Sequence, residues 1–249
     1  MSKSNNVYIQ KARKKRRIKR TIYLTILFII ILILVAWKSG IFSISNIEIT
    51  GDTIITGQFV EQKTDYLIGN NILLISKDEI KNIIMKNPYV SDVEITRNLP
   101  KTLTIEIKEA KGLYYQAEDV STYSIISDKL VLLERVNELE NNNLVELKGF
   151  NTDDKELGDI ISDDTRVSSL LDEFYREQEK IIENNENFKI TSLDLTDLSD
   201  IQVGLGNIKV YLGNDQDIRK KMSDAIQIYK SGRVTSYIKV GFEGTPDFK

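Results

Sequence analysis

The sequence predicts an α+β protein: one transmembrane helix, a small domain of β-α-α-β-β order, and a second mixed β-sheet domain with two helices. Three observations support this prediction. An uncharged stretch of 17 residues, Thr21 to Trp37, follows a strongly basic segment. Residues 41–109 show the pattern of a strand, two helices and two strands. Residues 110–243 combine short alternating strands with two amphipathic helices.

The uncharged stretch is just long enough to cross a bilayer core as a helix, so we expect a transmembrane helix over residues 21–38. Residues 1–20 contain nine Lys or Arg and no Asp or Glu. Such a flank stays in the cytoplasm, which makes residues 1–20 a cytoplasmic tail and places the rest of the chain outside. A cleavable signal peptide would have a shorter apolar core and small residues before the cut. A basic arm for nucleic acid is the other alternative, but a basic run beside an apolar helix is typical of a topology signal.

Composition limits the possible functions. Without the nine basic residues of the tail, residues 21–249 contain 25 basic and 37 acidic residues, a net charge of −12. Nucleic acid and anionic lipid are therefore poor partners for the outer part. The chain has no Cys and no His, so it has no disulfides, and it lacks the commonest zinc ligand and the usual general base near neutral pH. We expect no metal and no cofactor.

The first folded domain is predicted over residues 41–109. Ile47 and Ile49 alternate with polar residues, as in a half-buried strand. Thr56 can cap a first helix, and Ser76 with Glu79 forms a capping box for a second helix. After Pro88, two more alternating segments follow, the second with Leu103, Ile105 and Ile107 on one side. Three strands with both helices on one face would bury one small core.

The run from Asn87 to Glu109 (NPYVSDVEITRNLPKTLTIEIKE) resembles the end of the POTRA domain of FtsQ/DivIB cell-division proteins. In that family a Pro precedes a strand of V-x-V spacing, and Arg, Pro and Thr-Leu then lead into a second alternating strand that ends in Glu. Gly69 to Ile75 is similar to the segment between the two POTRA helices. POTRA domains also occur in outer-membrane assembly proteins, but those lack the basic tail and the single anchor. The order of tail, span, POTRA domain and β-rich domain follows the division family along the whole chain.

The second domain is predicted over residues 110–243. Residues 151–164 are rich in Asp and Glu and are expected to form a solvated connection before a long helix. Gly206 and Asn207 fit the turn of a hairpin. A second helix is expected to end at Ser231 and Gly232, before a last strand. Residues 244–249 are expected to form a short, loose C-terminal tail.

The last strand is the candidate binding site. A strand at the edge of a sheet offers free N–H and C=O groups to a partner strand. The resemblance implies that this strand contacts small coiled-coil division subunits of the FtsB/DivIC and FtsL type. Related chains often have Asp after the Ile at position 238, where this chain has Lys239. The alternative is that the strand only closes the sheet. The candidate partner-binding residues are Val234, Thr235, Ser236, Tyr237, Ile238, Lys239, Val240, Gly241 and Phe242.

Together with these features, the resemblance implies a non-enzymatic membrane scaffold of the division machinery, which binds protein partners at the outer face of the cytoplasmic membrane during septum formation. It has no expected small-molecule substrate or nucleic-acid partner. One alternative is an extracytoplasmic POTRA adaptor or sensor in protein transport. Another is a cell-wall glycosidase with two carboxylates, but no pair stands out among the 37 acidic residues. The spacing of Asp194, Asp197 and Asp200 hints at calcium, although the pattern of an EF-hand loop is missing.

Overall fold

The computed structural model describes residues 15–31, 40–119, 121–139, 143–241 and 246–249. Residues 15–31 form a helix that includes the first part of the predicted transmembrane segment. The rest of that segment, from residue 32 onward, lies outside the described residues. Among the helices that the structure describes, none is both long enough and apolar enough to cross a membrane.

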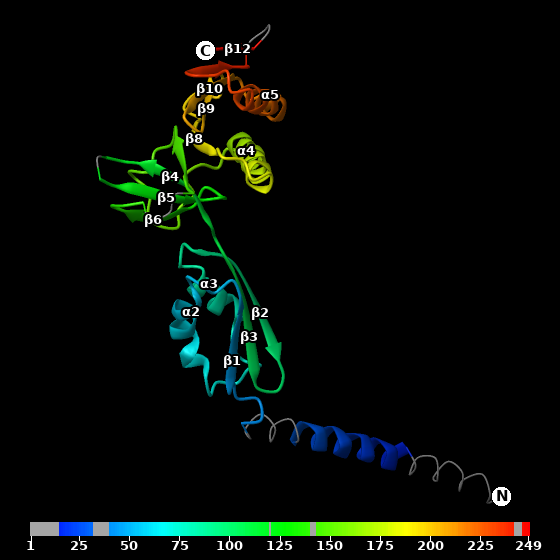
Figure 1. Cartoon of the computed structure of the whole chain (residues 1–249). Coiled ribbons are helices and arrows are strands. Elements are labelled where there is room, and N and C mark those ends of the chain that lie inside the picture. The colour runs from blue at the N-terminus through cyan, green and yellow to red at the C-terminus, as the bar shows by residue number, and fades with distance from the viewer. Residues whose placement is uncertain (1–14, 32–39, 120, 140–142, 242–245) are drawn as a thin grey trace, which may run out of the picture. The chain divides into compact units, whose positions relative to one another are not determined.

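The chain divides into two compact units, one formed by Met1–Ile84 and Val93–Ile107, the other by Met85–Asp92 and Lys108–Lys249. The elements of the first region follow the predicted order (Figure 1). They are β1 (Asn46–Gly51), α2 (Gly57–Thr64), the short 3-10 helix η1 (Asp65–Leu67), α3 (Lys77–Ile84), β2 (Val90–Asn98) and β3 (Thr102–Glu109).

The three strands form a sheet of order β1-β3-β2, in which β1 runs parallel to β3. Ile47 lies beside Leu103 and Ile49 beside Ile105. The predicted start of α3 is confirmed, because the hydroxyl oxygen of Ser76 accepts a hydrogen bond from the backbone N–H of Glu79 at 3.2 Å. Both helices lie on one face of this sheet (Figure 1). The buried core has residues from both layers: Val60, Leu67, Ile80, Ile84, Val93, Ile95, Leu103, Ile105 and Ile107.

In the residues that the structure describes, the second region is built on one sheet of nine strands, of order β12-β11-β10-β9-β8-β7-β4-β5-β6. Two helices pack on it. Most neighbours in the sheet are consecutive in the chain, and parallel pairs occur at β4–β7, β7–β8 and β10–β11. The elements are β4 (Gly112–Ala117), β5 (Tyr123–Ser127), β6 (Leu132–Val136), β7 (Val145–Lys148), α4 (Thr165–Glu183), β8 (Ile190–Asp194), β9 (Ile201–Leu205), β10 (Ile208–Gly213), α5 (Ile218–Lys230), β11 (Tyr237–Lys239) and β12 (Asp247–Phe248).

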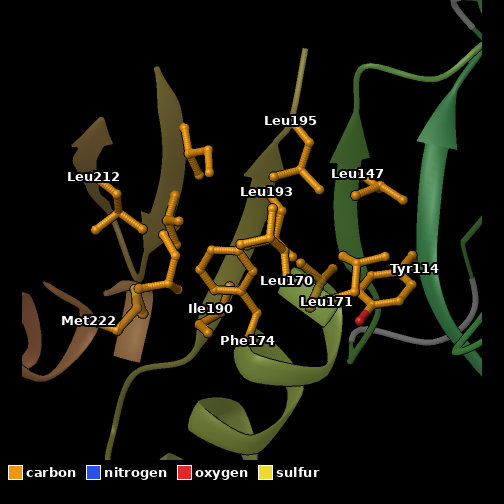
Figure 2. Close-up of a cluster of buried hydrophobic side chains, with 14 of the residues drawn as sticks. Tyr114, Leu147, Leu170, Leu171, Phe174, Ile190, Leu193, Leu195, Leu212 and Met222 are labelled. Carbon is orange, nitrogen blue, oxygen red and sulfur yellow. The ribbon is translucent and has the colours of Figure 1, made fainter. Parts of the chain in front are cut away.

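Helix α4 begins where Asp164 caps it, since the carboxylate of Asp164 accepts the backbone N–H of Arg166 at 2.8 Å. Its apolar side points into the sheet, with Phe174 only 1% exposed. Figure 2 shows Leu170, Leu171 and Phe174 directed toward strand residues such as Leu193. Ile182, which the helical pattern also places on the apolar side, is 62% exposed. Its neighbour Ile181 is 3% exposed, so the last turn still packs on the core and Ile182 lies at the border of the apolar side.

The acidic segment 151–164 is tied to the sheet. Arg135 on β6 donates from Nη2 to the backbone oxygens of Thr152 (2.7 Å) and Lys155 (3.0 Å), and its Nε contacts Glu118 at 3.3 Å. Burial raises the pKa of Glu118, but hydrogen bonds from Ser124 and Thr152 and the charge of Arg135 outweigh it, so the pKa lies below its ordinary value. The segment is thus held by a charged network at one end of the sheet.

Candidate interaction site at the C-terminal sheet edge

The candidate binding strand is shorter than predicted. Strand β11 covers only Tyr237–Lys239, and it lies parallel to β10 with Ile238 beside Val210. Parallel strands need a crossover connection, which here is α5. Met222 and Ala225 on this helix are fully buried, as is Ile238. The core of the domain therefore holds β11 in position from one face.

Strand β11 is not the edge of the sheet. Strand β12 pairs with it in antiparallel fashion, with Phe248 beside Ile238 and Asp247 beside Lys239. The backbone oxygen of Lys249 accepts the N–H groups of Thr235, Ser236 and Tyr237, at 3.0, 2.6 and 3.2 Å. Residues 235–239 therefore do not form a free edge, and residues 246–249 are not loose.

The nine predicted residues have different roles in this arrangement. Thr235 and Ser236 are exposed and precede β11, whereas Val234 packs against the core of the domain. Val240 follows the strand and donates its N–H to the oxygen of Tyr211 at 3.0 Å. Phe242 lies outside the described residues.

Gly241 lies against the backbone of β10. A Cβ atom built on Gly241 would lie 1.7 Å from the oxygen of Leu212 and 2.5 Å from the nitrogen of Gly213. Gly213 has a φ of +66°, which favours glycine. The two glycines therefore allow the chain after β11 to approach the end of β10 closely.

Aromatic and charged side chains cover the exposed face of this edge. The rings of Tyr211 and Tyr237 pack edge to face, with centroids 6.4 Å apart. Lys239 lies over both rings, at 5.5 and 5.2 Å, and Lys209 lies 5.4 Å from the ring of Tyr211. The hydroxyl of Tyr237 donates to Asp247 at 3.3 Å, and the charge of Asp247 raises the pKa of Tyr237. This face joins β10, β11 and β12 through side chains as well as backbone.

The opposite edge of the sheet is partly covered. Leu132 on β6 donates its N–H to the oxygen of Asp159 at 2.9 Å, and its own oxygen accepts the N–H of Gly158 at 2.8 Å. Val131 and Ile160 form an isolated antiparallel bridge. The segment that follows β7 therefore lies along β6, and within the part of the chain that the structure describes β12 is the less covered of the two edge strands.

The three Asp residues considered as a calcium site have local roles. Asp194 accepts hydrogen bonds from Thr196, Asp197 accepts them from Ser199, and Asp200 accepts one from Gln202 at 3.1 Å. Within the described residues, no group of three or more acidic side chains could hold a metal ion. These carboxylates stabilise turns between β8 and β9.

A hollow of about 900 Å³ opens beside the second half of α4. It is mainly apolar, with Tyr114, Phe174 and Phe188 among its lining residues and exposed Ile182 at its side. Glu186 at its rim pairs with Lys230. Sequence reasoning missed this hollow as well as β12, although an Ile on the last turn of α4 was the one signal of an apolar surface there.

Comparison with known families and proteins agrees with this architecture. Residues 42–110 match the family described as POTRA domain, FtsQ-type, and residues 115–240 match the family Cell division protein FtsQ/DivIB, C-terminal. The second match ends after β11 and before β12.

Similar proteins carry the same family name. The chain is 34% identical over 252 residues to the cell division protein DivIB of Clostridium botulinum (strain Hall), which covers 98% of this chain and 96% of that protein. It is 32% identical to DivIB of Clostridium acetobutylicum, over 98% of this chain and 97% of that protein. A shorter match, 32% identical over 76 residues, links 30% of this chain to 34% of the cell division protein FtsQ of Corynebacterium glutamicum. With a POTRA domain, a following mixed sheet and relatives of nearly equal length, the chain belongs to the FtsQ/DivIB family of bacterial cell-division proteins.

Proposed function

We propose that this protein is a single-span membrane scaffold of the division machinery. Residues 1–20 form its cytoplasmic tail and residues 21–38 its membrane anchor. The POTRA domain (41–109) and the β-rich domain (110–243) lie on the outer face of the cytoplasmic membrane. The basic tail before an uncharged segment supports this topology, and membership of a cell-division family supports the place of action.

The protein acts by binding rather than by catalysis. Its partners are the small coiled-coil division subunits of the FtsB/DivIC and FtsL type. Anchoring restricts the search for these partners to the membrane plane and raises their effective concentration. The scaffold holds these subunits at the outer face of the membrane during septum formation.

The observation that carries the proposal is the weakly covered edge at β11. Strand β12 has only two residues, both exposed, and it occupies the backbone groups that a partner strand would need. The main-chain N–H groups of Thr235 and Ser236 donate to the oxygen of Lys249, the residue after this strand. We assign the partner to this position: its strand replaces β12 and pairs with residues 235–239, with backbone hydrogen bonds for affinity and the Tyr211–Tyr237 face for selectivity.

Co-purification of the full-length membrane protein with the two subunits tests the site. Tyr237→Ala should weaken co-purification, since it removes one ring of the aromatic face. Tyr123→Ala is a matched control, because Tyr115 and Tyr123 form a similar edge-to-face pair, 5.9 Å apart, at the other end of the same sheet. Deletion of residues 234–249 should abolish binding. Full retention of the subunits by a folded deletion protein would reject the site.

Two further measurements test the scaffold itself. Protease added to intact protoplasts should digest the outer domains, and protection of those domains would reject the topology. Depletion of the protein should give long cells with incomplete septa. Normal division after depletion would contradict a role in septum formation.

A further inference from the structure

The POTRA unit exposes aliphatic side chains at the end where the chain enters it. Ile41, Ile68, Leu73, Leu74 and Leu99 have exposed fractions of 48%, 47%, 47%, 64% and 58%. The core does not need them, because Ile44, Leu67 and Ile72 from the same segments are almost fully buried. We call these five exposed residues the entry patch.

Backbone hydrogen bonds hold the three segments of the entry patch together. The N–H of Gly69 donates to the oxygen of Ile44 at 2.8 Å, and the N–H of Ile72 donates to the oxygen of Phe42 at 2.8 Å. The N–H of Ser45 donates to the oxygen of Lys101 at 3.0 Å, and this bond links the segment before β1 to the turn between β2 and β3. In Figure 1 the start of β1 and this turn lie at the same end of the unit. The aliphatic residues of the entry patch therefore share one rigid end of the unit.

The charge of the entry patch differs from that of the rest of the outer chain. Segments 40–46, 68–74 and 98–101 contain a single charged residue, Lys101, whereas residues 21–249 carry a net charge of −12. An uncharged aliphatic surface with a lysine at its border suits the interface of a bilayer, where apolar side chains enter and the ammonium group stays in water.

Chain length places the entry patch at the membrane. Ile41 follows Lys38, the last residue of the proposed anchor, by three residues, and three residues extend at most about 10 Å. The entry patch therefore cannot move far from the lipid surface while the anchor spans the bilayer. We propose that the entry patch inserts its aliphatic side chains into the outer interface of the membrane, which orients the POTRA domain. This inference rests on the proposed membrane anchoring.

The absence of Cys from the chain allows a direct test with single labelled cysteines. Full-length protein is placed in zwitterionic phosphatidylcholine vesicles that carry brominated acyl chains, and an environment-sensitive fluorophore is attached at one position. Leu74→Cys reports the entry patch, and Leu27→Cys reports the anchor. Ile54→Cys is the matched control, because Ile54 is also aliphatic and 97% exposed but follows the other end of β1, about 17 Å along the strand.

The fluorophore at position 74 should lose about half or more of its emission in brominated vesicles, because interfacial apolar side chains lie about 5–10 Å into the headgroup boundary. The fluorophore at position 54 should keep its emission. A second variant, Leu73→Asn with Leu74→Asn, should reduce the quenching of a label at Leu99, since all three side chains belong to one surface.

The outcomes separate this inference from the proposed anchoring. If position 27 is quenched but position 74 behaves like position 54, the anchor stands, the membrane contact is rejected, and the entry patch is left for a protein partner. If position 27 is not quenched and the chain does not float with vesicles, the anchoring is rejected and the entry patch inference with it.

Discussion

The close approach at Gly241 gives the sharpest prediction for the binding edge. Replacement of Gly241 by Ala adds one methyl group, whose carbon would lie 1.7 Å from the oxygen of Leu212 and 2.0 Å from its carbonyl carbon. An ordinary contact is roughly twice as long, so the two backbones must move apart by more than an ångström. The hydrogen bond from Val240 to Tyr211, now 3.0 Å long, cannot survive that shift.

The cost follows from the bonds that are lost. Strand β11 has three residues in register with β10, and one to three hydrogen bonds at about 1 kcal/mol each give a loss of about 1–3 kcal/mol. The loss is local, because β11 and β12 end the sheet while the core beneath α4 lies further along it. We therefore expect a folded domain with an open edge and weak partner binding.

Gly232→Ala is the control for this change. Gly232 has a positive φ of +68°, but an added Cβ meets nothing within 4 Å, so it costs only backbone strain of about 1 kcal/mol. Amide hydrogen exchange should show loss of protection at Val240 in the Gly241→Ala protein and none there in the control. Co-purification should fall only for Gly241→Ala. Native protection at Val240 together with native binding would refute the reasoning.

Three other predictions follow from the same structure. Deletion of residues 246–249 should increase subunit binding, because the deletion removes the strand that competes for β11; decreased binding in co-purification would show instead that the partner adds onto β12. Phe174→Ala should lower the free energy of unfolding, measured by urea titration, by about 3–5 kcal/mol. The control Tyr175→Ala, at an adjacent position that is 38% exposed, should change it little. Equal effects would contradict the packing in Figure 2. Because the pKa of Glu118 is lowered in the folded protein, its contribution to stability is complete above the ordinary carboxyl pKa and is lost as the pH falls through the folded pKa. Glu118→Gln should therefore flatten the acid side of a plot of urea midpoint against pH. An unchanged slope would exclude this carboxylate as a cause of the acid sensitivity.

Periodic patterns predicted most of the regular elements. The capping box at Ser76, the alternating Leu103, Ile105 and Ile107, and the hairpin around Gly206 are local signals, and each is found in the structure. The alternation works because burial on one face of a strand imposes a period of two, whereas the other two depend on a local hydrogen bond and on turn geometry. The FtsQ/DivIB family was predicted from the resemblance of residues 69–75 and 87–109 and from the order of the parts along the chain, and the family matches confirm it.

The errors occur where a segment is too short for a period. Strand β12 has two residues, and its position depends on backbone bonds to Lys249 rather than on an apolar pattern. Most of the acidic segment 151–164 is exposed, as predicted, but its attachment through Arg135, a residue distant in sequence, was not predicted. The sequence left open whether the last strand is a free edge or closes the sheet, and it gave no sign that β12 covers it. Hydrogen bonds between backbone groups that are distant in sequence produce no residue pattern in either segment, so the sequence does not predict them.

The crossover from α5 to β11 bears on how the edge responds to force. Six residues separate the end of the helix at Lys230 from Tyr237, and Ile218, Met222 and Ala225 are embedded below the sheet. A bound partner that pulls along the axis of β11 would have to pull α5 out of the core or break all the hydrogen bonds between β10 and β11 at once. Sideways peeling would break those bonds one after another. The force needed to detach a partner should therefore depend on the direction in which it is pulled.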